Sequence, residues 1–343
     1  ITFFFKIYFV LYNIKKMSNI KIVIPTLNRV NKQISFKNLP DKYKHKVYFI
    51  VREHEEKQMK EKYLNLIFGV KQQEAKAADV IVLPKNVPAG LPATKIFILE
   101  YFKNDKIYMI DDDLTFSRKR PNIEKIPNKK GIITKWRTIK MVEHDFDELF
   151  NEMENYMGSG IVHGAVNISS TPPSERYWPR NYNGKIGGNV FLDIPKLPKD
   201  VEYYRYCKTA EDYETNLQLL KKGFKNIIFT DFTASEKTGA PGGCATYRTL
   251  DMHNKSQLEL YGRHPDVVKI REKMTKDDKI RLDLTIYWKK AYNPLLCEEC
   301  DEIKDGDYCD CNEQLTFKEK KKIWEEEQKE KMASYNGGSC NWR

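Results

Sequence analysis

The sequence has no hydrophobic run long enough to cross a bilayer. Its most apolar stretch, residues 1–16, is shorter than the about 20 residues that a membrane-spanning helix requires. The stretch also lacks the basic start and the small-residue cleavage site of a secretory signal peptide. We therefore expect a cytoplasmic protein that starts at Met17, with residues 1–16 as upstream translated sequence. A membrane-surface anchor is the alternative if that segment is native.

The sequence has fewer acidic than basic residues. The 343 residues include 48 Asp and Glu against 59 Lys and Arg, which gives a formal net charge of +11. This balance suggests an anionic partner, either nucleic acid or a phosphorylated compound. With 41% hydrophobic and 31% charged residues, the composition is that of a globular protein with room for one large or two modest domains.

Cysteine is scarce, and four of the seven cysteines lie close together near the carboxyl end. They form a Cys-x-x-Cys pair and a Cys-x-Cys pair: Cys297, Cys300, Cys309 and Cys311. Four thiolates at this spacing fit a tetrahedral structural Zn²⁺ site. Disulfides are the alternative, but they are rare in cytosolic chains, so we expect zinc.

Three aspartates follow a strong strand signal. Residues 107–110 (Ile-Tyr-Met-Ile) predict a buried strand, and Asp111, Asp112 and Asp113 come directly after it. Strand alternation would place Asp111 and Asp113 on one side and Asp112 on the other. Because adjacent carboxylates repel each other, the run suggests a divalent cation, Mg²⁺ or Mn²⁺, that also binds a diphosphate. The alternative is a solvated acidic turn after a core strand.

Strands and helices alternate along the first part of the chain. Apolar runs predict strands at 20–24, 46–51 and 79–83, and helical spacing follows at 93–102. Such alternation predicts an α/β fold with a parallel sheet. The loops at the carboxyl edge of that sheet would form a ligand cleft.

A second acidic pair opens a predicted helix. Glu211 and Asp212 begin the segment EDYETNLQLLKKGF, and Gly223 marks its end. Acids in a first helical turn are common cap and dipole features. A carboxylate aimed at an alcohol in a water-poor cleft can also act as a general base, and we assign that role first to Asp212 and second to Glu211.

Basic, aromatic and glycine residues in the middle of the chain suggest contacts with nucleic acid. Residues 117–140 are a basic connection that could be a lid or could follow a phosphate backbone, with a solvated loop as the alternative. Within 171–183, aromatic and basic residues could stack on an extruded base, unless they form an ordinary packed loop. A pair of glycines further on could bring backbone amides to a phosphate. These DNA-binding candidates are Arg176, Tyr177, Trp178, Arg180, Tyr182, Gly242, Gly243 and Arg248.

The order of these motifs resembles the nucleotide-sugar half of a GT-A glycosyltransferase: IVIPTLNR, VREHE, PKNVPAGLPATK and IYMIDDDLTF. More narrowly, the Gly-Leu-x-x-x-Lys helix start, EDYETNLQLLKKGF and GGCATYRT are similar to the TET/JBP-associated glycosyltransferases, over residues 19–263. That family includes phage enzymes and the base J glucosyltransferase, which put sugars on hydroxymethylated pyrimidines in DNA. Lys95 stands where the family pattern has arginine, which keeps the charge and loses the bidentate fork.

The resemblance implies a metal-dependent and inverting enzyme. It would move glucose from a UDP-sugar to 5-hydroxymethylcytosine or 5-hydroxymethyluracil in double-stranded DNA, in a phage-infected host cell. The implied donor-binding residues are Pro25, Thr26, Arg29, Glu53, Lys95, Asp111 and Asp112. The implied ligands of Mn²⁺ or Mg²⁺ are Asp111 and Asp113 with a late histidine, either His253 or His264. Asp212 would take the proton from the acceptor hydroxyl.

The resulting prediction is an α/β, GT-A-like mixed sheet flanked by helices. It would occupy residues 17–265, followed by a helical and zinc-binding extension at 266–343. Two rival classes are a GT-A transferase for a protein, lipid or polysaccharide acceptor and a non-catalytic zinc-containing DNA-binding protein. The former would bind DNA weakly, and the latter would tolerate loss of Asp113 and Asp212.

Overall fold

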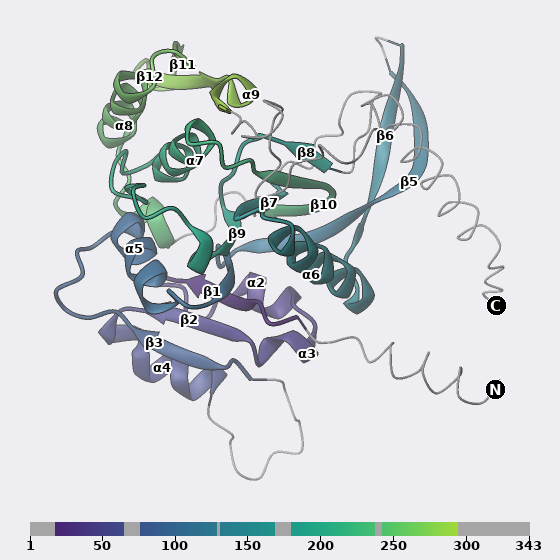
Figure 1. Ribbon diagram of the computed structural model, residues 1–343, viewed down its shortest axis with the longest axis vertical. Coiled ribbons are helices and arrows are strands. Elements are labelled where there is room, and N and C mark those ends of the chain that lie inside the picture. The colour runs from purple at the N-terminus through teal and green to yellow at the C-terminus, as the bar shows by residue number, and fades with distance from the viewer. Residues whose placement is uncertain (1–17, 65–75, 129–130, 169–179, 237–241, 294–343) are drawn as a thin grey trace, which may run out of the picture. The chain divides into compact units, whose positions relative to one another are not determined.

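The computed structural model describes residues 18–64, 76–128, 131–168, 180–236 and 242–293 (Figure 1). Several predictions fall outside these ranges and stay predictions. They concern residues 1–16, the DNA-binding candidates Arg176, Tyr177 and Trp178, and the four clustered cysteines, Cys297, Cys300, Cys309 and Cys311. In the ranges described, no helix is long and apolar enough to cross a bilayer.

A single large mixed sheet organises the described chain (Figure 1). Its first half is parallel, in the order β3 (Asp79–Val82), β2 (Val47–Val51), β1 (Lys21–Pro25) and β4 (Lys106–Ile110). The second half continues with β9 (Asn189–Asp193), β7 (His163–Asn167), β10 (Ile227–Glu236), β5 (Leu114–Asn128) and β6 (Gly131–Lys140), while β8 (Arg180–Tyr182) pairs with β10. The predicted α/β fold is therefore confirmed, and the arrangement is consistent with a GT-A fold.

The predicted strands form because their apolar runs are buried on both faces of the sheet. In β1, Ile22 and Ile24 enter one hydrophobic cluster and Val23 enters the cluster on the opposite face. Phe150 of α6 packs in the first cluster, and Ile98 of α5 packs in the second. The helices that flank the sheet are α2 (Ile34–Asn38), α3 (Asp41–Lys44), α4 (Glu53–Tyr63), α5 (Leu91–Tyr101), α6 (Glu143–Gly158) and the 3-10 turn η1 (Ile194–Lys196).

A third hydrophobic cluster packs the last described elements against α7 (Glu211–Lys221). It contains Leu217 of α7, Leu260 of α8 (Leu250–Arg263) and Val268 of β11 (Val268–Met274). The remaining elements are β12 (Ile280–Ile286), which pairs with β11, the helix α9 (Trp288–Ala291) and the 3-10 turn η2 (Gly243–Thr246). The boundary that the sequence suggested at residue 265 falls inside this packed cluster.

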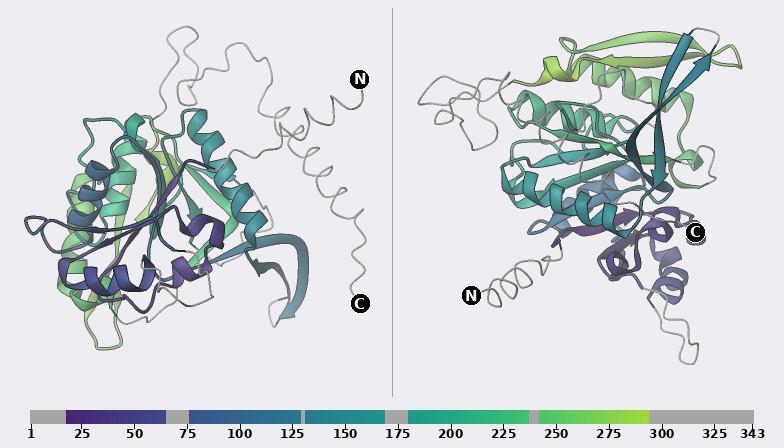
Figure 2. Two further views of the ribbon diagram at one scale, coloured as in Figure 1. Left: turned by 90° about the horizontal axis from the view of Figure 1, so that it is seen from below. Right: turned by 90° about the vertical axis from the view of Figure 1, so that its right-hand side faces the viewer.

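The basic connection at 117–140 is not a loop. Only Leu114–Arg118 of β5 pairs with β10, and the rest of β5 pairs with β6 alone as far as Asn128 and Gly131. The register shifts between Arg120 and Ile123, so Pro121, which has no backbone donor, falls at the irregularity. The two strands therefore form an arm that projects from the sheet (Figures 1 and 2).

Candidate active site

The end of β1 and the end of β4 meet because the two strands pair in parallel. Strand β4 ends at Ile110, so the three aspartates lie in the turn that leads to β5. Arg29 Nη1 donates to Asp112 Oδ1 at 2.6 Å and to Asp113 Oδ2 at 2.8 Å. The alternation expected from a strand is therefore wrong, since Asp112 and Asp113 contact the same guanidinium nitrogen.

Asp112 fixes the turn that follows β1. Thr26 Oγ1 donates to Asp112 Oδ2 at 2.6 Å, and Gln33 Nε2 donates to Thr26 Oγ1 at 2.8 Å. Burial raises the pKa of Asp112, while its hydrogen bonds from Thr26 and Arg29 oppose that rise. Asp112 thus orients Thr26 and Arg29, and these side chains come together as the sequence predicted.

The glycine pair at 242–243 packs against Arg29. Both glycines have positive φ, of 100° and 62°. A β-carbon on Gly242 would lie 2.9 Å from Arg29 Cγ, and one on Gly243 would lie 3.0 Å from Arg29 Cζ. The Gly243 amide donates to the Leu27 carbonyl at 3.0 Å, and Arg29 Nη2 donates to the Gly242 carbonyl at 3.1 Å. The pair therefore closes the turn after β1, in contact with a residue predicted to bind the donor.

Lys95 binds both acids at the start of α7. This side chain comes from α5 and is almost fully buried. Its Nζ donates to Glu211 Oε1 at 2.9 Å and to Asp212 Oδ1, both at the start of α7. Burial alone would lower the pKa of Lys95, but Asp212 and Glu211 raise it well above its ordinary value. Burial raises the pKa of Glu211.

Asp111 faces this cluster. Together with Lys95, Gly188 and Asp212, it lines a small pocket. Burial raises the pKa of Asp111 well above its ordinary value; Lys95 opposes the rise, and nearby carboxylates, Asp212 first, add to it. Excess negative charge thus gathers on one side of the site.

Gly188 lies close to two carboxylates, those of Asp111 and Glu236, because it has no side chain. A β-carbon on Gly188, whose φ is +68°, would lie 3.0 Å from Glu236 Oε1 and 3.5 Å from Asp111 Oδ2. The sequence analysis missed Glu236, which ends β10. The paired glycines of GKIGGNVFLD were the available signal, because glycine in a strand often marks a close approach.

The carboxylates fit a hard divalent cation. Asp111 and Asp113 would supply oxygen ligands, since Mg²⁺ commonly takes one or two carboxylates and completes its shell with water and substrate phosphate. Among the described residues, no group of three or more His, Cys, Asp and Glu side chains is arranged to hold a metal. The donor set therefore suits a cation that binds together with a diphosphate.

Comparison with known proteins decides the family. Residues 20–243 match the model of the TET-Associated Glycosyltransferase family, which is more than half of the chain. The chain belongs to this family. Two relatives, from Enterobacteria phage T6 and Enterobacteria phage T2, are both called Beta-glucosyl-HMC-alpha-glucosyl-transferase. Each is 25% identical over 248 residues, which cover 72% of this chain and 82% of the relative.

Membership of the TET-Associated Glycosyltransferases confirms the resemblance and makes the protein a glycosyltransferase. The family model covers Arg29, Lys95, the three aspartates and the acidic pair of α7, which are the residues that converge. It ends at residue 243, before α8 and the hairpin β11–β12.

Other predicted site residues have partners elsewhere. Glu53 is exposed at the start of α4 and pairs with Lys85 at 3.2 Å, whereas the buried Glu55 accepts from the Asn28 amide at 2.7 Å. Pro25 ends β1, where it lies opposite Ile50 of β2.

The two late histidines have different contacts. The ring nitrogen Nε2 of His253 lies 2.9 Å from the Leu282 carbonyl, and that of His264 lies 3.6 Å from Glu214 Oε1. Neither histidine has a described contact with Asp111 or Asp113.

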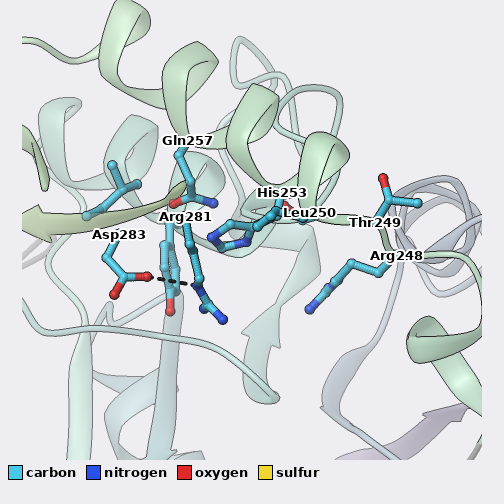
Figure 3. Close-up of a pocket in the computed structure, with 10 residues that line it drawn as sticks. Arg248, Thr249, Leu250, His253, Gln257, Arg281 and Asp283 are labelled. Carbon is cyan, nitrogen blue, oxygen red and sulfur yellow. Dashed lines mark hydrogen bonds and ion pairs between the residues drawn. The ribbon is translucent and has the colours of Figure 1, made fainter. Parts of the chain in front are cut away.

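The DNA-binding candidates within the described ranges lie at different places and have different contacts. Arg180 is mostly buried, and its guanidinium binds Asp231 and Glu152 and lies over the Phe229 ring. The ring of Tyr182 packs under Lys225, with 4.1 Å between the Lys225 Nζ and the ring centroid. Arg248 is exposed and lines a much larger pocket between α7, α8 and β12 (Figure 3).

Proposed function

We propose that the protein transfers a sugar, glucose, from a UDP-sugar to a hydroxymethylpyrimidine in DNA. The observation that carries the proposal is the convergence of Asp111, Lys95 and Asp212 at one small pocket in a TET-Associated Glycosyltransferase. The pocket lies at the carboxyl end of β4, where open α/β sheets hold their ligands.

The donor end of the reaction lies at the turns after β1 and β4. Thr26 and Arg29, held by Asp112, would contact the nucleotide. Asp111 and Asp113 would hold Mg²⁺ or Mn²⁺. A divalent cation in such a site neutralises the charge that develops on a departing diphosphate. Lys95 adds a buried positive charge on the same side, as a point charge without the bidentate geometry of arginine.

The acceptor end lies at the start of α7. Asp212 has a partly exposed carboxylate that lines the small pocket, whereas Glu211 is buried. We therefore keep Asp212 as the group that accepts the proton of the acceptor hydroxyl. Lys95 Nζ contacts that carboxylate and would hold it in place. Removal of a positioned general base typically slows a reaction by about 100-fold or more.

The basic arm supports a DNA acceptor. Residues 117–140 contain nine lysine and arginine residues and one acidic residue, and they form the projecting strands β5 and β6. A two-stranded ribbon can enter the major groove of B-DNA, and each phosphate contact adds salt-dependent affinity. The arm would therefore hold the duplex while the active site acts on one base.

The names of the two relatives favour a second acceptor. Both names describe an alpha-glucosyl transfer to beta-glucosyl-HMC, an acceptor that already carries a sugar. The acceptor of this chain would then be a glucosylated hydroxymethylcytosine in DNA. The two possible mechanisms, inversion and retention at the anomeric carbon, give different products. From an α-linked donor, inversion gives a β-linked product and retention gives an α-linked product. An α-linked product would remove the reason for assigning Asp212 as the base of an inverting step.

One transfer assay tests the proposal. The protein is incubated with labelled UDP-glucose, Mn²⁺ and duplexes that contain cytosine, hydroxymethylcytosine, hydroxymethyluracil or β-glucosyl-hydroxymethylcytosine. Transfer only to hydroxymethylated or glucosylated duplexes supports it, and the NMR coupling of the anomeric proton gives the linkage. Donor hydrolysis without transfer to any duplex would instead indicate a protein, lipid or polysaccharide acceptor.

Variants then test the assigned residues. Asp111→Asn and Asp212→Asn should each lower transfer by about 100-fold or more. Asp200→Asn is the matched control, because Asp200 is an exposed acid that pairs with Lys222 and lines neither pocket. Transfer that survives both active-site substitutions would exclude the assigned machinery.

A further inference from the structure

A second pocket lies beside the active site and is not explained by donor binding. It has a volume of about 640 Å³, within the range of pockets that enclose a ligand of drug size. Its walls come from the start of α7, from α8 and from β12 (Figure 3). Helix α8 and strand β12 lie beyond residue 243, where the family model ends.

Two polar groups inside this pocket lack partners. Gln257 is only 5% exposed and lines the pocket, yet its carboxamide makes no hydrogen bond with the described part of the chain. The hydroxyl of Thr209, whose amide donates to Ser256 Oγ of α8 at 3.2 Å, is also buried without a described partner. By contrast, both amide atoms of Asn254, one turn earlier on α8, bond to β12 at 2.9 Å. Because Gln257 lines the pocket and its carboxamide has no described partner, this group is available to bond to a ligand there.

Two guanidinium groups flank the pocket. Arg248 is exposed and makes no ion pair within the described ranges. Arg281 donates from Nε to Asp283 at 3.0 Å, and its terminal nitrogens have no described acceptor. In Figure 3 the ring of His253 lies between the two arginines, with Nε2 turned to the Leu282 carbonyl. The rim is therefore positive, as an anionic ligand requires.

The first turn of α7 separates this pocket from the catalytic one. Asp212 lines the small pocket with Lys95 and Asp111, while Tyr213, the next residue, lines the large pocket. The Tyr213 ring packs edge-on against Trp288 at 5.6 Å, which fixes its position. A ligand in the large pocket would thus contact the residue that follows the proposed base in α7.

We propose that this pocket receives the acceptor nucleobase extruded from the duplex, with Gln257 bonding to its hydrogen-bonding edge and Arg248 and Arg281 holding flanking phosphates. The proposal rests on the proposed function and adds the acceptor site to it. A carboxamide carries a donor and an acceptor side by side, which suits the edge of a base. An enzyme that modifies a base must take it out of the stack, and an aromatic ring such as Tyr213 can support it there.

Gln257→Leu tests the base contact. The leucine is close in size, so the pocket keeps its packing while the carboxamide is lost. We expect the ratio of transfer to donor hydrolysis to fall at least tenfold on every modified duplex that the wild type uses. Gln218→Leu is the matched control, because it removes a carboxamide from α7 that bonds to Glu202, outside both pockets. Thermal unfolding of both variants checks that each is folded.

Gln257→Glu tests the direction of the contact. A carboxylate can accept from the amino group of cytosine but cannot donate to the carbonyl of uracil. The variant should therefore shift the ratio of hydroxymethylcytosine to hydroxymethyluracil transfer towards cytosine. An unchanged ratio, together with unchanged transfer by Gln257→Leu, would overturn the assignment of this pocket.

Arg248→Gln and Arg281→Gln test the phosphate contacts. Each should reduce the slope of log affinity against log salt by about 1 for duplex DNA. Arg271→Gln is the control, since Arg271 lies on β11, bonds to Thr285 and lines neither pocket. Wild-type slopes in both arginine variants would refute the phosphate contacts. Failure of the wild type to modify any duplex would instead refute the proposed function itself.

Discussion

His163 should make the folded state lose stability in acid by a calculable amount. Its side chain is fully buried in β7, and its Nε2 lies 3.2 Å from Asn216 Oδ1 on α7. The other ring nitrogen, Nδ1, is buried and has no partner among the described residues. Asn226 Nδ2 donates to the same Asn216 oxygen at 2.7 Å, so the network ties α7, which carries Asp212, to the sheet. His163 is therefore a hydrogen-bonded core histidine that joins β7 to α7.

Protonation of Nδ1 would place a charge in a dry site, so burial lowers the pKa of His163 from 6.5 to about 4. Above pH 6.5 the ring is neutral in both states and the group has no effect. Between pH 6.5 and pH 4 the unfolded chain binds the proton and the folded chain does not, so stability falls as the pH falls. The loss from this one group over that range is about 3 kcal/mol.

The measurement is the difference between two stability curves. Chemical denaturation of the wild type and of His163→Gln is followed from pH 7.5 to pH 4, because glutamine keeps a donor toward Asn216 and takes up no proton. The difference separates the effect of His163 from groups that make the folded state more stable as the pH falls. One such group is Asp231, because burial raises its pKa to about 6. The wild type should lose about 3 kcal/mol more than the variant. His45→Gln removes an exposed histidine as the control, and parallel curves for wild type and His163→Gln would refute the reasoning.

Four further predictions concern the site and the arm. Asp111→Asn should raise the midpoint of thermal unfolding while it lowers transfer about 100-fold or more, because the amide avoids the cost of a buried carboxylate; a lower midpoint would contradict this. Gly243→Ala should cost about 1–2 kcal/mol of stability and raise the KM for the donor, since its β-carbon would meet Arg29, whereas Gly158→Ala has open space and should do neither. Replacement of residues 120–137 by a two-residue turn should weaken duplex binding and flatten its salt dependence, as a filter-binding titration would show. Metal analysis should find one zinc per chain in the wild type and none in Cys297→Ser/Cys300→Ser; equal zinc in both would exclude the cysteine site.

The sequence predicted those strands and helices whose buried residues form a recognisable local pattern. The strands β1 to β4 are continuous apolar runs, because both faces of the sheet are covered, and α5 has a clear helical spacing. Their parallel order places the turn after β4, with Asp111, beside the turn after β1, with Thr26 and Arg29. The family motifs therefore pointed to residues that the fold brings together, while their roles stay predictions.

The sequence could not predict features that depend on pairing or on tertiary register. The arm β5–β6 is polar and basic, so it shows no apolar alternation, and its backbone pairing alone makes it a ribbon. Glu236 and Asp111 both come close to Gly188, and only the tertiary fold produces this proximity. Glu53 and Glu55 are equally plausible from composition, but α4 begins at Glu53, which leaves Glu55 as the acid that faces Asn28.

The three aspartates have different tasks because the strand ends before them. If β4 continued through residue 113, Asp112 would point away from both neighbours and would be free to vary. In the turn, Asp112 instead bonds Thr26 and shares Arg29 with Asp113, while Asp111 remains beside Lys95. Asp112 therefore fixes the turn after β1, which we propose binds the donor, and Asp111 adds negative charge to the pocket that Asp212 also lines. Loss of Asp112 should consequently raise the KM for the UDP-sugar before it alters the chemical step, since Thr26 and Arg29 are proposed to bind the donor and not to react.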